Sequence, residues 1–125
     1  MALAFLQAGA MKPILPRVHG LIDYAACALM VAAPHLLDLH PGARRISYAL
    51  AGSYLGVSAL TDYPPALRRL LPFPVHGKIE LSTLPVLLLA AALQKETRER
   101  AYFLALAGTV AGIYSLTDWQ ADPDA

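Results

Sequence analysis

The sequence has little cysteine and little charge. Of its 125 residues only Cys27 is a cysteine, which excludes a disulfide framework. Charged residues make up 15% of the chain, against roughly 25% in soluble domains. The formal net charge is +1, so the protein has no field that would attract nucleic acid, and a basic recognition motif is missing too. Together with the hydrophobic content, this balance excludes a nucleic-acid-binding protein and a disordered chain.

Motifs of nucleophilic and phosphate chemistry are also missing. The chain contains no Gly-x-Ser-x-Gly motif and no glycine-rich phosphate loop ahead of a helix. Cys27 has no histidine three or four residues away that could activate it. The sequence therefore leaves open whether the protein is an enzyme.

Hydrophobic residues dominate the chain, at 57% of the total. Four stretches lack a polar face at helical spacing, and a helix that is apolar on all sides lies either in the core of a large protein or in lipid. A chain of this size cannot bury four such helices, because each helix of a four-helix bundle has one outward side. We predict an all-α protein with four transmembrane helices in a lipid bilayer, over residues 18–37, 43–62, 75–94 and 101–118.

An internal repeat organises these stretches. The motif Val-His-Gly-x-Ile followed by Asp or Glu occurs at 18–23 and returns at 75–80, an offset of 57. The motif Leu-Thr-Asp followed by Tyr or Trp occurs at 60–63 and returns at 116–119, an offset of 56. A repeat of this kind predicts two copies of one structural unit.

Each copy reads as a helical hairpin. Repeat 1 covers 18–62 and repeat 2 covers 75–118, and the linker 63–74 contains four prolines, so we expect it to be an ordered connection. A hairpin crosses the membrane twice and returns to its starting side. The two copies therefore have parallel topology, related by an axis along the membrane normal.

The repeated two-helix unit resembles a known family. With its proline near the end of the first helix, in Ala-Pro-His at 33–35, it is similar to the SPW-repeat family of small bacterial membrane proteins, whose repeats carry a Ser-Pro-Trp signature. The second copy reads Ala-Ala-Ala at the aligned place, 90–92. The likeness covers most of residues 14–120. It implies a bacterial inner-membrane protein, and it brings no reaction, cofactor or active-site residue with it.

Charge does not determine the orientation in the membrane. Five Lys or Arg residues lie on the side of the termini and five on the side of the short turns, so the positive-inside rule favours neither. We expect cytoplasmic termini, because four helices bring both ends to one side. The segment 1–11 contains Ala-Gly-Ala but no positive n-region, so we expect no cleaved signal peptide.

Small residues recur at a four-residue spacing on the second helix of each repeat. Gly52 and Gly56 form one Gly-x-x-x-Gly motif, and Gly108 and Gly112 form the other. Such motifs let two helices approach closely in lipid. We predict that they pack helices together within the bundle; the alternative is a homodimer formed through the same faces.

The repeated motifs also bring ionisable residues to one end of the bundle. In each repeat a histidine and a carboxylate four residues apart share one helix face, and an aspartate ends the second helix at the same level. Two histidines with four carboxylates resemble the ligands of di-iron and di-manganese bundles and suit Mn, Fe or Zn. The predicted metal ligands are His19, Asp23, Asp62, His76, Glu80 and Asp118.

Other functions remain open for the same region. His19 and His76 could ligate a haem instead, the cluster could relay protons, or it could be a hydrogen-bonded network that holds the repeats together. Tyr24, Tyr63 and Trp119 lie beside the cluster and could line a pocket for a ligand or cofactor, or they could anchor the protein in the membrane interface. The sequence thus predicts a structural or ligand-binding membrane module, with a metal-binding protein or enzyme as the alternative.

Overall fold

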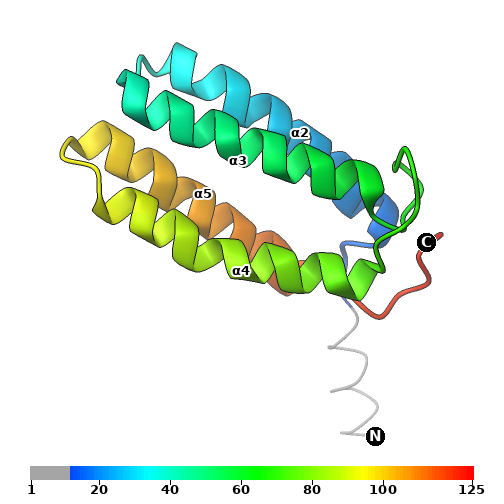
Figure 1. The fold of residues 1–125 in the computed structure, drawn as a ribbon. Helices are drawn as coiled ribbons and strands as arrows, with labels where there is room; N and C mark the ends of the chain where they lie inside the picture. The colour runs from blue at the N-terminus through cyan, green and yellow to red at the C-terminus, as the bar shows by residue number, and fades with distance from the viewer. Residues whose placement is uncertain (1–11) are drawn as a thin grey trace, which may run out of the picture.

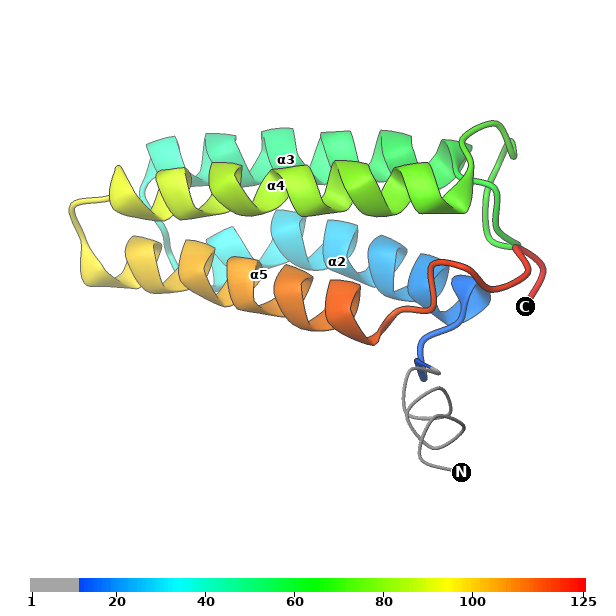
Figure 2. The same ribbon diagram turned by 90° about the horizontal axis from the view of Figure 1, so that it is seen from below.

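The protein is a bundle of four helices. A computed structural model describes residues 12–125 and contains two helical hairpins, which confirms the predicted all-α architecture. The hairpins lie side by side, with their short turns at one end and the linker and C-terminus at the other (Figures 1 and 2). The helices are α2 (Pro16–Leu36), α3 (Pro41–Leu60), α4 (Phe73–Ala92) and α5 (Thr97–Leu116).

Close packing occurs inside each hairpin, between α2 and α3 and between α4 and α5. The buried side of α3 is mostly small, so its backbone can approach α2 closely. Ser47 donates a hydrogen bond to the Met30 carbonyl of α2 at 2.6 Å and lies 2.6 Å from the Tyr102 hydroxyl of α5, which ties the two hairpins together. The buried residues of α3 are Ala43, Ser47, Ala51, Tyr54 and Ser58.

The Gly-x-x-x-Gly motifs lie on the outside of the bundle. A Cβ atom added to Gly52, Gly56, Gly108 or Gly112 would meet nothing within 4 Å. The prediction that these glycines pack helices within the bundle is therefore wrong. A homodimer through these faces stays a prediction.

Two short backbone pairings connect the repeats at the end of the bundle that holds the linker. Ile14, before α2, pairs in parallel with Thr117, after α5. Leu71, before α4, pairs in the same way with Thr61, after α3. The internal repeat relates the two pairings to each other. Each one places a threonine from the end of one repeat beside the first helix of the other.

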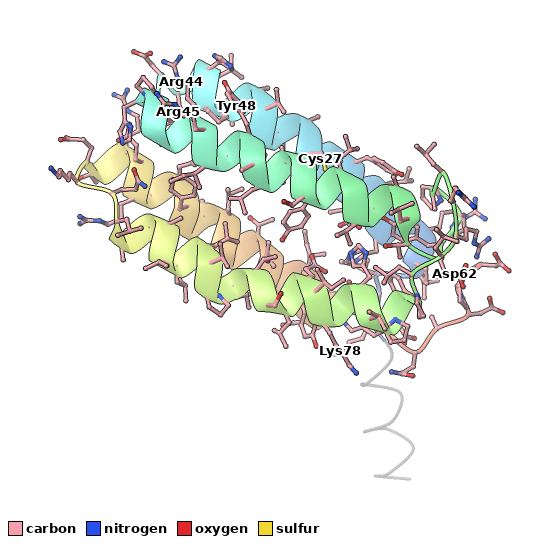
Figure 3. The ribbon with its side chains drawn as sticks, viewed as in Figure 1. Cys27, Arg44, Arg45, Tyr48, Asp62 and Lys78 are labelled. Atoms are coloured by element: carbon pink, nitrogen blue, oxygen red, sulfur yellow. The ribbon has the colours of Figure 1, made fainter. Side chains whose placement is uncertain are left out.

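The outer surface combines an apolar middle with charged ends. Large apolar side chains are exposed along the helices, among them Leu29 on α2, Leu55 on α3, Leu89 on α4 and Leu104 on α5. In the described part of the chain, exposed charges lie in the turns, the linker, the terminal segments and the first two turns of a helix. Figure 3 shows Arg44 and Arg45 near one end, and Asp62 and Lys78 near the other.

Among the described helices, α4 alone is both long and apolar enough to span a membrane. The other three have similar lengths, but their sequences are less hydrophobic on average. The prediction about a signal peptide falls on residues 1–11, which lie outside the described residues.

Candidate metal centre

Two histidines and two carboxylates form a buried cluster at the end of the bundle that holds the linker. His19 lies in the first turn of α2 and His76 in the first turn of α4, and Asp23 and Glu80 follow one turn later on the same faces. Their residue exposures are 0%, 1%, 2% and 4%, in that order. The structure thus brings together four of the six predicted ligands.

Each histidine faces carboxylates from both repeats. The Nε2 atom of His19 lies 3.3 Å from Asp23 Oδ1 and 3.3 Å from Glu80 Oε2. The Nε2 atom of His76 lies 3.3 Å from Asp23 Oδ2 and 4.0 Å from Glu80 Oε2. The two imidazole rings are nearly perpendicular, with centroids 5.1 Å apart. The four side chains therefore converge on one point between α2 and α4.

A threonine holds the other nitrogen of each ring. The hydroxyl of Thr117 lies 2.9 Å from His19 Nδ1 and donates to the Ile113 carbonyl at 2.6 Å. The hydroxyl of Thr61 lies 2.6 Å from His76 Nδ1 and likewise donates to a carbonyl one turn earlier, at 2.6 Å. Because a hydroxyl has one hydrogen, each threonine oxygen accepts from Nδ1–H. In a neutral ring Nε2 then carries a lone pair that faces the carboxylates.

The centre of the cluster contains polar atoms that lack partners. His19 Nε2 and Glu80 Oε2 are buried and form no hydrogen bond. Within the described residues, the ion pairs of Asp23 and Glu80 are with histidine only, and no Lys or Arg neutralises them. Buried negative charge is costly unless it is paired. The negative charge is therefore neutralised in one of two ways, by protons on the histidines or the carboxyl groups or by a metal cation.

The geometry fits one metal ion. Zinc-ligand bonds of about 2.0–2.1 Å place neighbouring ligands of a tetrahedron about 3.3 Å apart. Three of the four distances from a histidine Nε2 to a carboxylate oxygen are 3.3 Å. His19, His76 and Glu80 each offer a ligand atom, and these atoms all lie within 4.8 Å of one another. Asp23 is outside this group of three, but its two carboxylate oxygens each lie 3.3 Å from one histidine Nε2, which makes it the candidate for a fourth ligand.

The other two predicted ligands, Asp62 and Asp118, point away from the cluster. Asp62 forms an ion pair with Arg69 at 2.6 Å, and Asp118 accepts the backbone N–H of Gln120 at 3.1 Å. The reason is local: Thr61 and Thr117 have extended backbone angles, and successive side chains of an extended segment point to opposite sides. An inward threonine therefore forces the next residue outward. The prediction of these two aspartates as ligands is wrong, and with it the six-ligand dinuclear site.

The glycine after each histidine makes room for an aromatic ring. A Cβ atom on Gly20 would lie 2.7 Å from a side-chain carbon of Pro65 and 3.1 Å from the Tyr63 ring. A Cβ atom on Gly77 would lie 2.8 Å from the Trp119 ring. The internal repeat relates Tyr63 to Trp119, so the two rings cover the end of the cluster in equivalent ways.

Tyr63 also takes part in the hydrogen bonding of the cluster. Its side chain is fully buried, and its hydroxyl donates to Asp23 Oδ2 at 3.1 Å. Burial and the neighbouring negative charge of Asp23 raise the pKa of the Tyr63 phenol, so the group stays protonated and acts as a donor. Sequence reasoning missed this role and the roles of the two threonines, although all three residues belong to the repeated motif.

The three aromatic residues predicted to line a ligand or cofactor pocket make different contacts. Tyr24 is half-buried, and its hydroxyl donates to the Pro65 carbonyl in the linker at 3.0 Å. Tyr63 and Trp119 pack over the cluster, and the Trp119 ring centroid lies 4.9 Å from that of His19. The structure thus places Tyr63 and Trp119 over the cluster and Tyr24 against the linker, and a pocket lined by all three stays a prediction.

A haem between the histidines does not fit this arrangement. The Asp23 carboxylate lies 3.3 Å from both Nε2 atoms, so it fills the space that a porphyrin would need between them. Because the cluster keeps only imidazole and carboxylate donors around one point, small metal ions remain the cofactors that suit it.

Comparison of the chain with protein-family models, with curated proteins and with solved structures finds no match. The resemblance to the SPW-repeat family therefore stays a prediction. Any function must be argued from the geometry of the cluster itself.

Proposed function

We propose that this protein binds one divalent transition-metal ion, Zn²⁺, Fe²⁺ or Mn²⁺, between its two repeats. The ligands are Nε2 of His19 and His76 and the carboxylates of Asp23 and Glu80. The observation that carries the proposal is that His19 Nε2 and Glu80 Oε2 are buried and form no hydrogen bond, although they lie 3.3 Å apart. A metal ion between them would satisfy both atoms.

The charge of the cluster supports a divalent ion. Two ionised carboxylates and two neutral imidazoles carry a charge of −2, which one divalent cation cancels without any protonation. Imidazole and carboxylate ligands suit the three proposed metals. The Nδ1–H groups held by Thr61 and Thr117 are the outer hydrogen bonds that commonly orient metal-ligating histidines.

We further propose that the bundle lies in a lipid bilayer, with all four helices as spans. Helices of 20 or 21 residues are about 30 Å long, which matches the hydrocarbon core of a bilayer. Their outer surfaces are apolar in the middle and charged near the ends. Soluble monomers rarely expose apolar surface on this scale.

Titration with cobalt tests the metal proposal, because Co²⁺ substitutes for these ions and its visible spectrum reports coordination. The detergent-purified protein, stripped with chelator, should bind one Co²⁺ per chain and develop absorption bands of low coordination number. His76→Ala should abolish these bands. His35→Ala is the matched control, because His35 is exposed at the opposite end of the bundle and stacks on Tyr48. A wild-type protein that binds no cobalt at the cluster would show that the histidines serve a hydrogen-bonded network instead.

A further inference from the structure

Two small cavities border the cluster, and the internal repeat relates them to each other. One lies between α3 and α4 and has a volume of about 50 Å³; its lining includes Val57 and Ile79. The other lies between α5 and α2 and has a volume of about 40 Å³; its lining includes Ile113 and Ile22. The repeat offsets relate Val57 to Ile113 and Ile79 to Ile22. The cluster therefore has two equivalent sides, from either of which a small molecule could reach it.

The two sides differ in how they meet the cluster. The α3/α4 cavity is bordered by His76 and Glu80, one ligand of each kind. The α5/α2 cavity is bordered by Asp23 and Glu80 but by no histidine. Each cavity thus borders two of the four cluster residues, but the α3/α4 cavity alone borders a histidine.

The two sides also differ in a pair of hydroxyl groups, Tyr54 and Thr83, which has no equivalent at the related positions of the other repeat. Thr83 gives its hydrogen to the Glu80 carbonyl at 2.6 Å, so the Tyr54 hydroxyl, 2.9 Å away, donates to Thr83. The Tyr54 oxygen keeps its lone pairs free to accept another hydrogen bond. Tyr54 borders both cavities, but Thr83, the hydrogen-bond partner of its hydroxyl, borders only the α3/α4 cavity.

The equivalent pair on the other side has no hydroxyl. The repeat relates Tyr54 to Val110 and Thr83 to Ala26, and both of these apolar residues border the α5/α2 cavity. The lining of that cavity also includes Tyr54 and Thr109, but the two positions equivalent to Tyr54 and Thr83 are aliphatic, and burying a hydrogen-bond donor against them is costly. On the α3/α4 side the Tyr54 oxygen can accept such a hydrogen.

We propose that the exchangeable coordination position of the metal faces the α3/α4 cavity and takes a small oxygen- or nitrogen-donor ligand. The inference rests on the proposed metal site. Since one water-sized molecule needs roughly 10–15 Å³, the cavity of about 50 Å³ limits the ligand to about three to five non-hydrogen atoms. Water is the resident ligand, and a hydrogen of that water is donated to Tyr54. An ion that gains a ligand in this way becomes five-coordinate, as zinc does in catalytic sites.

Azide binding to the cobalt-loaded protein tests this inference. Azide has three atoms, fits the size limit, and changes the visible spectrum of Co²⁺ when it binds. Val57→Phe fills the α3/α4 cavity and should weaken azide binding at least tenfold while one Co²⁺ per chain is retained. Ile113→Phe fills the equivalent cavity on the other side and should leave azide affinity within twofold of wild type.

A second pair of variants guards against misfolding of the first. Ile79→Phe, on the α4 wall, should block azide, and its repeat equivalent Ile22→Phe should not. A wild-type protein that binds Co²⁺ but shows no azide response would overturn the inference while leaving the metal proposal intact. Equal effects of the variants on both sides would also overturn it. A wild-type protein that takes up no Co²⁺ would overturn the metal proposal itself.

Discussion

Thr61 and Thr117 decide which nitrogen of each histidine faces the cluster. Each threonine gives its own hydrogen to a backbone carbonyl and can only accept from Nδ1–H. A residue without a ligand atom thus determines whether Nε2 can bind a metal. The arrangement is reciprocal, since each repeat supplies the threonine that orients the histidine of the other.

Thr61→Val should weaken metal binding while the fold is retained. Valine keeps the shape of threonine but cannot accept from Nδ1–H, so the imidazole of His76 loses its orienting partner. Loss of such an outer hydrogen bond typically costs about 10–100-fold in metal affinity, which competition with a coloured chelator would measure. Thr61→Ser should restore binding. Asp62→Asn, the next residue along, should have no effect, and an equal loss in that variant would contradict the account.

Gly77→Ala should destabilise the protein. The new Cβ would lie 2.8 Å from the Trp119 ring, and overpacking of this kind costs about 1–3 kcal/mol in the free energy of unfolding. Gly108→Ala is the matched control on α5, because its Cβ would meet nothing within 4 Å. Thermal unfolding in detergent should show a lower midpoint for the first variant and an unchanged or higher midpoint for the second. Equal midpoints would argue against the close packing of Trp119.

The sequence predicted the histidine–carboxylate pairs of the cluster but not the threonines that orient the histidines. The i, i+4 spacing correctly placed His19 with Asp23 and His76 with Glu80 on shared faces. In the Leu-Thr-Asp motif we predicted the aspartate as the residue that faces the cluster, whereas the structure places the threonine there. The backbone is extended at the threonine, and the pattern of the preceding helix does not show which side chain of an extended segment points inward. The recurrence of threonine in both copies was the available signal.

At the scale of secondary structure, two short backbone pairings hold the two repeats together next to the cluster. They join the start of one repeat to the end of the other, at Ile14 with Thr117 and at Leu71 with Thr61. The four apolar stretches of the sequence placed the helices within about four residues of their observed ends. The pairings lie outside the helices and depend on contacts between distant parts of the chain, so the pattern of the sequence could not predict them.

Ser47→Ala should loosen the contact between the two hairpins. The substitution removes the group that Tyr102 bonds and leaves the tyrosine hydroxyl without that partner, at a cost of about 1–3 kcal/mol. Ser53→Ala is the matched control on the same helix, because Ser53 is exposed and bonds only the Ala49 carbonyl. Denaturation in mixed micelles would measure the free energy of unfolding of the two variants and of the wild type. Adding Tyr102→Phe to Ser47→Ala should recover part of the loss; no recovery would contradict the proposed link.

The distribution of polar groups over the whole molecule is inverted relative to a soluble protein. Asp23, Glu80 and both cluster histidines are buried, while leucines and valines cover the middle of the outside. Within the described residues α4 alone is apolar enough along its sequence for a span, although it carries His76 and Glu80, and large apolar side chains are exposed on all four helices.

The protein should fractionate with membranes. After cell lysis it should remain in the membrane pellet through alkaline carbonate and high-salt washes, because burial of the apolar surface in lipid does not depend on charge. Detergent should release it. Recovery as a soluble monomer without detergent would contradict the location in the bilayer, whatever the state of the metal site.

Elemental analysis of the detergent-purified protein tests the central claim, that the two repeats share one metal ion. We predict one atom of Zn, Fe or Mn per chain, lost both in His19→Ala and in His76→Ala, because each repeat supplies half of the ligands. Asp62→Asn and Asp118→Asn should keep the full content. A folded wild-type protein that contains no metal and takes up none on incubation with these ions would contradict the account, as would a metal that survives removal of either histidine.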